Sequence, residues 1–179
     1  MGITILLFFI LYMSDQILKF IMVKVGERPL IVGVDSVNYF IKLRTQYNDG
    51  AAFSLGSEYG HTATIIFTII SFIATIVLII ICTKFNNWKR NKTQAIALTM
   101  ALAGCVGNLF DRFMTSVGVM PGVVDMIYFK PFEWICDLIH VGYGVFNLAD
   151  LYLVTGICLF AFDYLFFNER KKRKWQESK

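Results

Sequence analysis

Long apolar stretches separated by short polar segments dominate this chain of 179 residues. A helix needs about 20 mostly apolar residues to cross a bilayer, and four stretches meet that length. They cover residues 2–23, 62–83, 93–114 and 146–167. The second, TATIIFTIISFIATIVLIIICT, contains no charged residue, whereas Asp15 and Lys19 interrupt the first. The pattern predicts an all-α membrane protein with four transmembrane helices.

Composition supports this class. Hydrophobic residues make up 56% of the chain and charged residues 17%, with a mean hydropathy of +0.60, whereas a soluble domain averages about 25% charged residues. The first stretch, 2–23, has an alternative interpretation as a cleavable signal peptide. It lacks a basic n-region and a small-residue cleavage site, and its apolar run is too long. We therefore expect it to stay as a transmembrane helix.

Lysine and arginine mark the cytoplasmic segments of a membrane protein. They are dense in the short loop KFNNWKRNK (84–92) and in the tail NERKKRKWQESK (168–179), and sparser in the connections 24–61 and 115–145. We therefore expect both termini and the 84–92 loop to be cytoplasmic and the two longer connections to face outward. This topology accounts for the net charge of +4, so we expect membrane lipids as partners and no nucleic acid.

The two outer connections have patterns of their own. NYFIKLRTQYN (38–48) alternates in side-chain character with period 2, as a half-buried strand does, and Asn48-Asp49-Gly50 after it predicts a turn. The second connection is rich in aromatic residues, which favour the headgroup level. We expect a small extracytoplasmic β-sheet, an interfacial helix or loop, and a single membrane-embedded domain over residues 1–179.

The polar residues of the apolar stretches fall at one membrane depth. Given the predicted directions of the helices, all of them except Asp163 lie near the outer leaflet, close to two polar residues of the outer connections. They come from three apolar stretches and two connections: Asp15 and Lys19; Asn108, Asp111 and Arg112; Asn147 and Asp150; and, from the connections, Asn48 and Asp125. Gly104 and Gly107 predict a close approach of the third helix to a neighbour.

Several of these residues also have purely structural interpretations. Asp15 and Lys19, at i and i+4, form a neutralising ion pair in the simplest interpretation. Asp111 and Arg112 together suit anchoring of a helix end at the headgroups. Asn147 suits a hydrogen bond to another helix.

The two remaining aspartates suggest chemistry. Asp125 by itself fits a solvated loop charge. A charge in a span costs about 2.5–3.5 kcal/mol, however, and such residues are usually functional, which applies to Asp150. Two carboxylates close together can share one proton. One then takes a proton from water while the other gives one to a carbonyl oxygen.

Other membrane hydrolases have motifs that this sequence lacks. HExxH of zinc site-2 enzymes, GxSG of rhomboid-type serine enzymes and GxGD of presenilin-type aspartyl enzymes are all absent. The four cysteines, Cys82, Cys105, Cys136 and Cys158, have no CxxC or Cys/His spacing. We expect no metal and no other cofactor.

The chain resembles the bacterial lipoprotein signal peptidases, or signal peptidase II. Five blocks occur in the order of that family, between spans of matching orientation. They are SDQILKF, YNDGAAFS, GCVGNLFDR, VVDMI and FNLAD. The chain differs from the family pattern in two places. The segment between Asp125 and Asp150 is longer than expected, and Ala103 and Cys105 stand where Gly and Ala are common in the family.

The resemblance implies an aspartic endopeptidase of the bacterial inner membrane, with four helices, a small outer sheet and an interfacial helix. Its substrate would be a prolipoprotein, cut just before a diacylglyceryl-modified cysteine, and globomycin-type compounds would inhibit it. Asp125 and Asp150 would be the catalytic pair. Dyad-supporting or substrate-binding roles would fall to Asn48, Asn108, Arg112, Asn147, Asp15 and Lys19.

Two other functions fit the sequence less well. An ion- or proton-coupled transporter also uses intramembrane carboxylates, but it needs polar residues through the whole membrane depth. Here the cytoplasmic halves of the last three helices are nearly all apolar, apart from Asp163. A non-catalytic scaffold explains neither the two aligned carboxylates nor the absence of a soluble domain.

Overall fold

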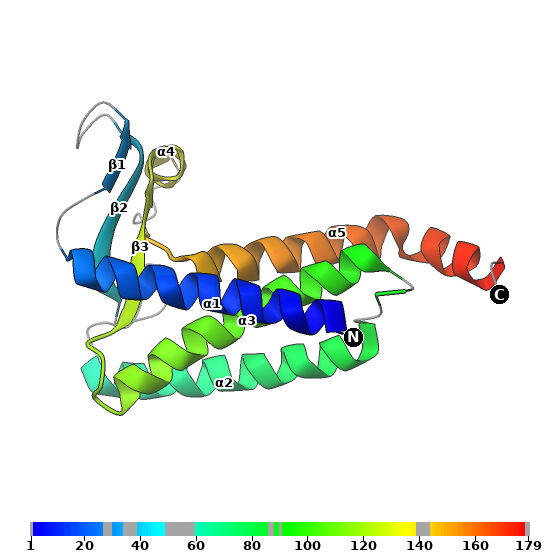
Figure 1. The fold of residues 1–179 in the computed structure, drawn as a ribbon, viewed down its shortest axis with the longest axis horizontal. Coiled ribbons are helices and arrows are strands. Elements are labelled where there is room, and N and C mark those ends of the chain that lie inside the picture. The colour runs from blue at the N-terminus through cyan, green and yellow to red at the C-terminus, as the bar shows by residue number, and fades with distance from the viewer. Residues whose placement is uncertain are drawn as a thin grey trace.

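Four long helices lie side by side, and a small sheet with a short helix sits at one end of them (Figure 1). The computed structural model describes residues 2–26, 30–33, 39–48, 60–85, 88–89, 91–138 and 144–177. The helices are α1 (Gly2–Val25), α2 (Gly60–Phe85), α3 (Lys92–Ser116), α4 (Lys130–Leu138) and α5 (Leu148–Glu177). The strands are β1 (Leu30–Gly33), β2 (Tyr39–Asn48) and β3 (Val123–Phe129). The predicted fold class is confirmed.

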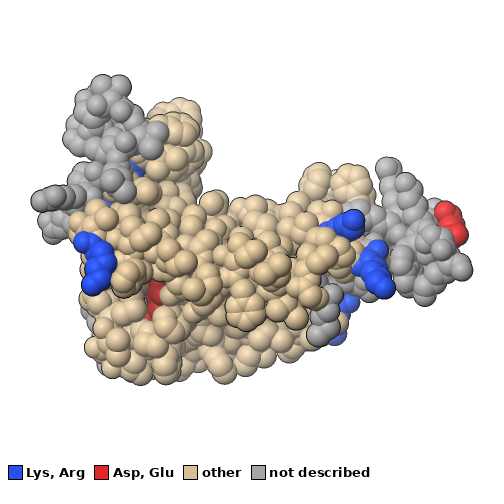
Figure 2. Space-filling view, viewed as in Figure 1, with Lys and Arg blue, Asp and Glu red and all other residues tan. Residues whose placement is uncertain are grey.

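Within the described residues, four helices are long and apolar enough to cross a membrane: α1, α2, α3 and the first part of α5, Leu148–Phe167. Large apolar side chains cover their outer faces, which suits contact with lipid and not with water. Figure 2 shows that the Lys and Arg side chains visible on one face lie toward the two ends of the molecule and leave its middle free of them. Both chain ends lie at the end of the bundle away from the sheet (Figure 1).

The central helix is α3, which α1, α2 and α5 all contact. Small residues allow the closest of these approaches, as is usual between membrane helices. A Cβ atom on Gly156 of α5 would lie 2.5 Å from the backbone of Ala97 and Ala101 in α3. Gly104 of α3 lies as tightly against the backbone of Ala149 and Leu153 in α5. The close approach predicted at Gly104 is therefore present, and it fixes α5 against α3.

The sheet is antiparallel, in the order β1-β2-β3. The alternating sequence at 38–48 forms β2, and Gln46 pairs with Asp125 of β3. Asp125 was expected in a loop, but it lies in a strand. The period-2 signal was missing there because Val123, Val124, Asp125 and Met126 are all buried, so both faces of the strand are covered.

The chain before α5 is tied to β3. The amides of Met126 and Ile127 donate to the carbonyl of Phe146, at 3.1 and 2.8 Å, and the amide of Phe146 donates back to Ile127. Under this junction, buried Met22 packs with Val124 and Met126. These contacts bring Asn147, the residue after Phe146, next to Asp125. The sheet therefore positions one predicted site residue against another.

Some expectations fall outside the described residues. The predicted turn after Asn48 involves Asp49 and Gly50, which the structure does not describe. The same holds for most of the YNDGAAFS block and for the side chains of the basic tail over residues 168–176.

Candidate active site

The predicted site residues come together where α1, α3 and the start of α5 meet β2 and β3. Asp125 lies on β3, and Asn48 lies at the end of β2. Asn108 and Arg112 come from the last turns of α3, and Asn147 directly precedes α5. Segments that are far apart in the sequence thus supply a single site.

Asp125 is 3% exposed and accepts hydrogen bonds on both carboxylate oxygens. Asn147 Nδ2 donates to Oδ1 at 2.7 Å, and Asn48 Nδ2 donates to Oδ2 at 3.0 Å. The two amides approach from opposite sides, one from the start of α5 and one from β2. They hold the carboxyl group of Asp125 in a fixed direction.

Asp150 is held by the beginning of its own helix. Its Oδ2 accepts from the backbone N–H of Asn147 at 3.1 Å, while its own N–H donates to Oδ1 of Asn147 at 2.9 Å. This reciprocal pair is a capping box, in which Asn147 is the N-cap and Asp150 the third helical residue. The other oxygen of Asp150, Oδ1, accepts from Asn108 Nδ2 at 2.7 Å. The cap explains an asparagine and an aspartate at the start of an apolar helix.

Asn147 and Asn108 connect the two aspartates. Asn147 Nδ2 also donates to Asn108 Oδ1, at 3.1 Å, and Asn108 in turn donates to Asp150. Asn147 is fully buried and lies behind the two carboxyl groups. The Asp125 and Asp150 side chains are therefore linked through shared amides.

Asp15 and Lys19 lie in a second layer beneath this network. Lys19 Nζ is 2.8 Å from Asp15 Oδ2 and 3.4 Å from Asn108 Oδ1. Asp15 Oδ1 accepts from the backbone N–H of Ala149 at 2.9 Å, so α1 supplies an additional cap to α5. The predicted ion pair between Asp15 and Lys19 is confirmed, and the two residues also contact the start of α5 and Asn108.

Asp111 and Gln16 belong to the same layer. Asp111 Oδ2 lies 2.7 Å from Lys19 Nζ, and Gln16 Nε2 lies within 3.3 Å of both Asp15 and Asp111. Asp111 is buried, so its predicted role as a headgroup anchor is wrong. The signal available in the sequence was the i,i+3 spacing from Asn108, which places both residues on one side of α3.

A cavity of about 610 Å³ opens in front of the two aspartates. Its lining includes the polar residues Asn48, Ser71, Asn108, Arg112, Asp125 and Asp150. Its apolar walls come from α2, α4 and α5 and include Ile70, Ala74, Phe132, Ile135 and Val154. A pocket with convergent polar groups and apolar walls suits a largely apolar ligand with one reactive polar group.

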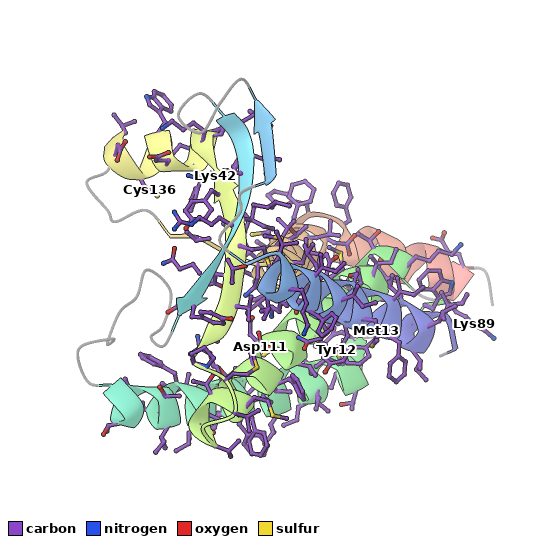
Figure 3. All side chains as sticks on the ribbon, turned by 60° about the vertical axis from the view of Figure 1, so that its left-hand side comes forward. Tyr12, Met13, Lys42, Lys89, Asp111 and Cys136 are labelled. Atoms are coloured by element: carbon purple, nitrogen blue, oxygen red, sulfur yellow. The ribbon has the colours of Figure 1, made fainter. Side chains whose placement is uncertain are left out.

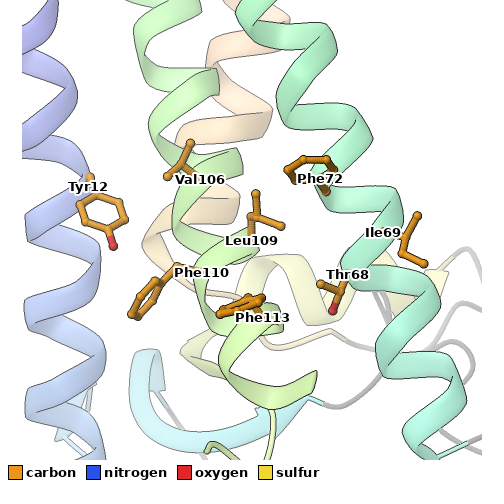
Figure 4. Close-up of a pocket in the computed structure, with 8 residues that line it drawn as sticks. All are labelled: Tyr12, Thr68, Ile69, Phe72, Val106, Leu109, Phe110 and Phe113. Carbon is orange, nitrogen blue, oxygen red and sulfur yellow. The ribbon is translucent and has the colours of Figure 1, made fainter. Parts of the chain in front are cut away.

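A second hollow, of about 480 Å³, lies between α1, α2 and α3. Figure 4 shows its lining, which is apolar apart from Tyr12 and Thr68. It contains no carboxylate, and we do not assign chemistry to it. Among the residues that the structure describes, no group of three or more His, Cys, Asp and Glu side chains is arranged to hold a metal ion.

The surroundings of Asp125 make it a weaker acid than an ordinary aspartate. Burial, and next the charge of Asp150, raise the pKa of Asp125 from its ordinary value of 3.8 to about 7. The hydrogen bonds from Asn48 and Asn147 act in the opposite direction but do not compensate. A carboxyl group with a pKa near 7 can give or take a proton at neutral pH.

Comparison with known proteins identifies the family. The family described as "Signal peptidase (SPase) II" matches residues 7–166. A lipoprotein signal peptidase of Fusobacterium nucleatum is 32% identical over 178 residues, covering 96% of this chain and 92% of that protein. One from Borrelia turicatae is 31% identical over 170 residues, covering 92% of this chain and 87% of the relative.

Solved structures agree with this result. A bacterial membrane enzyme solved by the in meso method at 2.3 Å has a TM-score of 0.70 and 26% identity, covering 92% of this chain and 88% of that one. A second such enzyme, with a TM-score of 0.65 and 24% identity, shares the fold. The chain therefore belongs to the signal peptidase II family, the aspartic peptidases that remove signal peptides from prolipoproteins.

Proposed function

We propose that Asp125 and Asp150 are the catalytic pair of this peptidase and activate a water molecule against the scissile peptide bond. One observation carries the proposal. Two carboxyl groups from separate segments, Asp125 buried and Asp150 half-buried, are linked through Asn147 and line the same cavity. Such a pair can hold one proton between its members and exchange it with a substrate.

The surroundings of the two residues favour different roles. Asp125, with a pKa of about 7, can hold the shared proton at neutral pH. Asp150 lies in the first turn of α5, where the helix dipole and two N–H donors stabilise negative charge. Asp150 is therefore the general base, and Asp125 is the general acid.

The reaction then balances. The water oxygen bonds to the carbonyl carbon as Asp150 takes a proton from the water and Asp125 gives its proton to the carbonyl oxygen. The resulting tetrahedral diol collapses as the C–N bond breaks. Asp150 gives its proton to the leaving nitrogen, and Asp125 regains a proton from a diol hydroxyl group. Both residues return to their starting states.

The polar residues that line the cavity position the substrate. Asn48 and Arg112 line it beside the aspartates and supply donors for peptide carbonyl groups. The apolar walls from α2 and α5 suit the signal peptide and the acyl chains of the lipid-modified cysteine that follows it. We place the cut just before a diacylglyceryl-modified cysteine, because this arrangement keeps the acyl chains in lipid while the peptide bond reaches Asp125 and Asp150.

The membrane orientation follows from charge. Lys84, Lys89 and Lys92 are exposed near the end of the bundle away from the sheet, and Figure 3 labels Lys89 there. Basic residues favour the cytoplasmic side, so the termini are cytoplasmic and the active site lies near the outer leaflet of the inner membrane. On α4, the exposed Trp134 and Leu138 suit contact with membrane lipids. A globomycin-type inhibitor would occupy the cavity.

A cleavage assay tests the proposal. The purified protein is expected to cut a diacylglyceryl-modified prolipoprotein before the modified cysteine. Asp125→Asn and Asp150→Asn are each expected to abolish cleavage while the protein stays folded. Asp163→Asn is the matched control, since Asp163 is equally buried but pairs with Asn91 near the start of α3. Full activity in either dyad variant would remove that residue from the chemistry.

A further inference from the structure

A buried cluster of charges lies directly behind the proposed catalytic pair. The ammonium group of Lys19 sits between two carboxylates, 2.8 Å from Asp15 and 2.7 Å from Asp111. All three side chains are at most 4% exposed. Figure 3 shows Asp111 inside the bundle, toward the sheet. Since burying charge is costly, this arrangement calls for an explanation beyond stability.

The cluster touches the site through the amide of Asn108. Asn108 Oδ1 accepts from Lys19 at 3.4 Å and from Asn147 at 3.1 Å, while Nδ2 donates to Asp150 at 2.7 Å. The two ends of an amide differ little in shape, so hydrogen-bond partners decide its orientation. A rotated amide would turn its NH₂ group toward the Lys19 ammonium and the Asn147 donor. The position of Lys19 therefore selects the orientation that serves Asp150.

Asp111 sets the position of Lys19. An ammonium group has three N–H donors, and Asp15, Asp111 and Asn108 provide an acceptor for each. The Asp15 carboxylate also accepts hydrogen bonds from the backbone N–H of Ala149 and from Gln16. Gln16 donates to Asp111 as well and links the two carboxylates. Without Asp111, the charge of Asp15 would draw Lys19 toward α1 and away from Asn108.

We infer that Asp111 is a positioning residue, which acts through Lys19 to fix the Asn108 amide in the orientation that donates to Asp150. The inference rests on the proposed role of Asp150.

The first test compares two buried aspartates. Asp111→Asn and Asp163→Asn each remove one buried carboxylate, and both are expected to lower the melting temperature. Asp111→Asn is expected to lower kcat about tenfold, as loss of a charged hydrogen bond does, with little change in KM. Asp163→Asn is expected to keep kcat within about twofold, the size of a minor perturbation. Equal kcat losses in the two variants, or none in Asp111→Asn, would overturn the inference.

The second test asks whether Asp111 acts through Asn108. The rate of cleavage is measured in single turnover with enzyme in excess, for variants that already carry Asn108→Ala. In these variants, Asp111→Asn is expected to have little further effect on that rate. Equal fold-losses in both backgrounds would contradict a route through Asn108. If Asp111→Asn does not fold, Gln16→Met replaces it, since Gln16 donates to Asp111. An unchanged kcat in that variant would count against the inference.

A stability cycle separates this inference from the proposed function. Melting temperatures of the wild type, Asp111→Asn, Asn108→Ala and the double variant need no activity. The double variant is expected to lose less than the two single losses combined, because both changes break one network. Additive losses would overturn the coupling. Absence of any cleavage by the wild type would instead refute the proposed function.

Discussion

Asn147 donates a 2.7 Å hydrogen bond to Asp125 and, three residues before Asp150, caps the helix that carries this second aspartate. One buried asparagine therefore sets the direction of both carboxyl groups. Capping and catalysis place different demands on this residue, because the cap uses its Oδ1 and backbone N–H, whereas Asp125 uses its Nδ2.

The two roles of Asn147 can be separated by substitution. Serine is as good an N-cap as asparagine, whereas alanine lacks the capping oxygen and costs about 0.5–2 kcal/mol more. Alanine has no donor for Asp125, and the serine hydroxyl is held closer to the backbone than the Asn147 Nδ2 that bonds Asp125. We expect Asn147→Ser to melt above Asn147→Ala, while both lower kcat by about 10- to 100-fold, as loss of a charged hydrogen bond of 1.5–3 kcal/mol implies. Wild-type kcat in Asn147→Ser would show that the hydrogen bond to Asp125 is dispensable.

Asn48 should set the alkaline limit of activity. If Asp125 is the general acid, kcat/KM falls as pH rises through its pKa of about 7. The Asn48 hydrogen bond stabilises the ionised form, so Asn48→Ala raises the pKa further and moves this limit to higher pH, by about half a unit or more. Gln46→Ala is the control, because Gln46 lies on the same strand and bonds Tyr128. If kcat/KM of Asn48→Ala falls at the same alkaline pH as that of the wild type, Asn48 does not set this limit.

Stability should depend on the protonation of Asp125. Its pKa is 3.8 when the chain is unfolded and about 7 when it is folded, so between these values the folded state binds more protons. The contribution of Asp125 to stability is therefore fully present below about pH 4 and is lost as pH rises to about 7, by up to about 4 kcal/mol. We expect the melting temperature of the wild type in detergent to fall more from pH 5 to pH 8 than that of Asp125→Asn. If the melting temperatures of the wild type and of Asp125→Asn fall equally with pH, the raised pKa of Asp125 is refuted.

The packing of α3 against α5 should be intolerant of added volume. In Gly104→Ala and Gly156→Ala the new Cβ meets backbone of the facing helix, which costs about 1–3 kcal/mol or more. Gly104 contacts Ala149, next to Asp150, so this variant is expected to lose kcat as well as stability. Gly156→Ala is expected to lose stability with less change in kcat. Gly2→Ala is the neutral control, since no atom lies within 4 Å of its Cβ position.

An unchanged melting temperature in Gly104→Ala would show that the two helices separate at little cost. A kcat loss in Gly156→Ala as large as in Gly104→Ala would show that helix packing in general, and not the position of Ala149, controls the rate.

The sequence by itself determined the four membrane helices, the strand at 39–48 and the family. These features depend on local patterns, namely apolar length, period-2 alternation and short motifs, which any segment displays without its neighbours. The same patterns singled out Asp125, Asp150 and their companions as site residues. The strand that carries Asp125 was missed, because its residues are buried on both faces and show no alternation.

Tertiary structure alone decided which atom bonds which. Asn147 reaches Asp125 because Phe146 pairs with Ile127, and Asp15 caps α5 because α1 and α5 both pack on α3. Asp111 points into the bundle toward Lys19, while Arg112, its neighbour in sequence, lines the cavity. Adjacent helical residues point in directions about 100° apart, so the packing of other helices decides which one faces the interior.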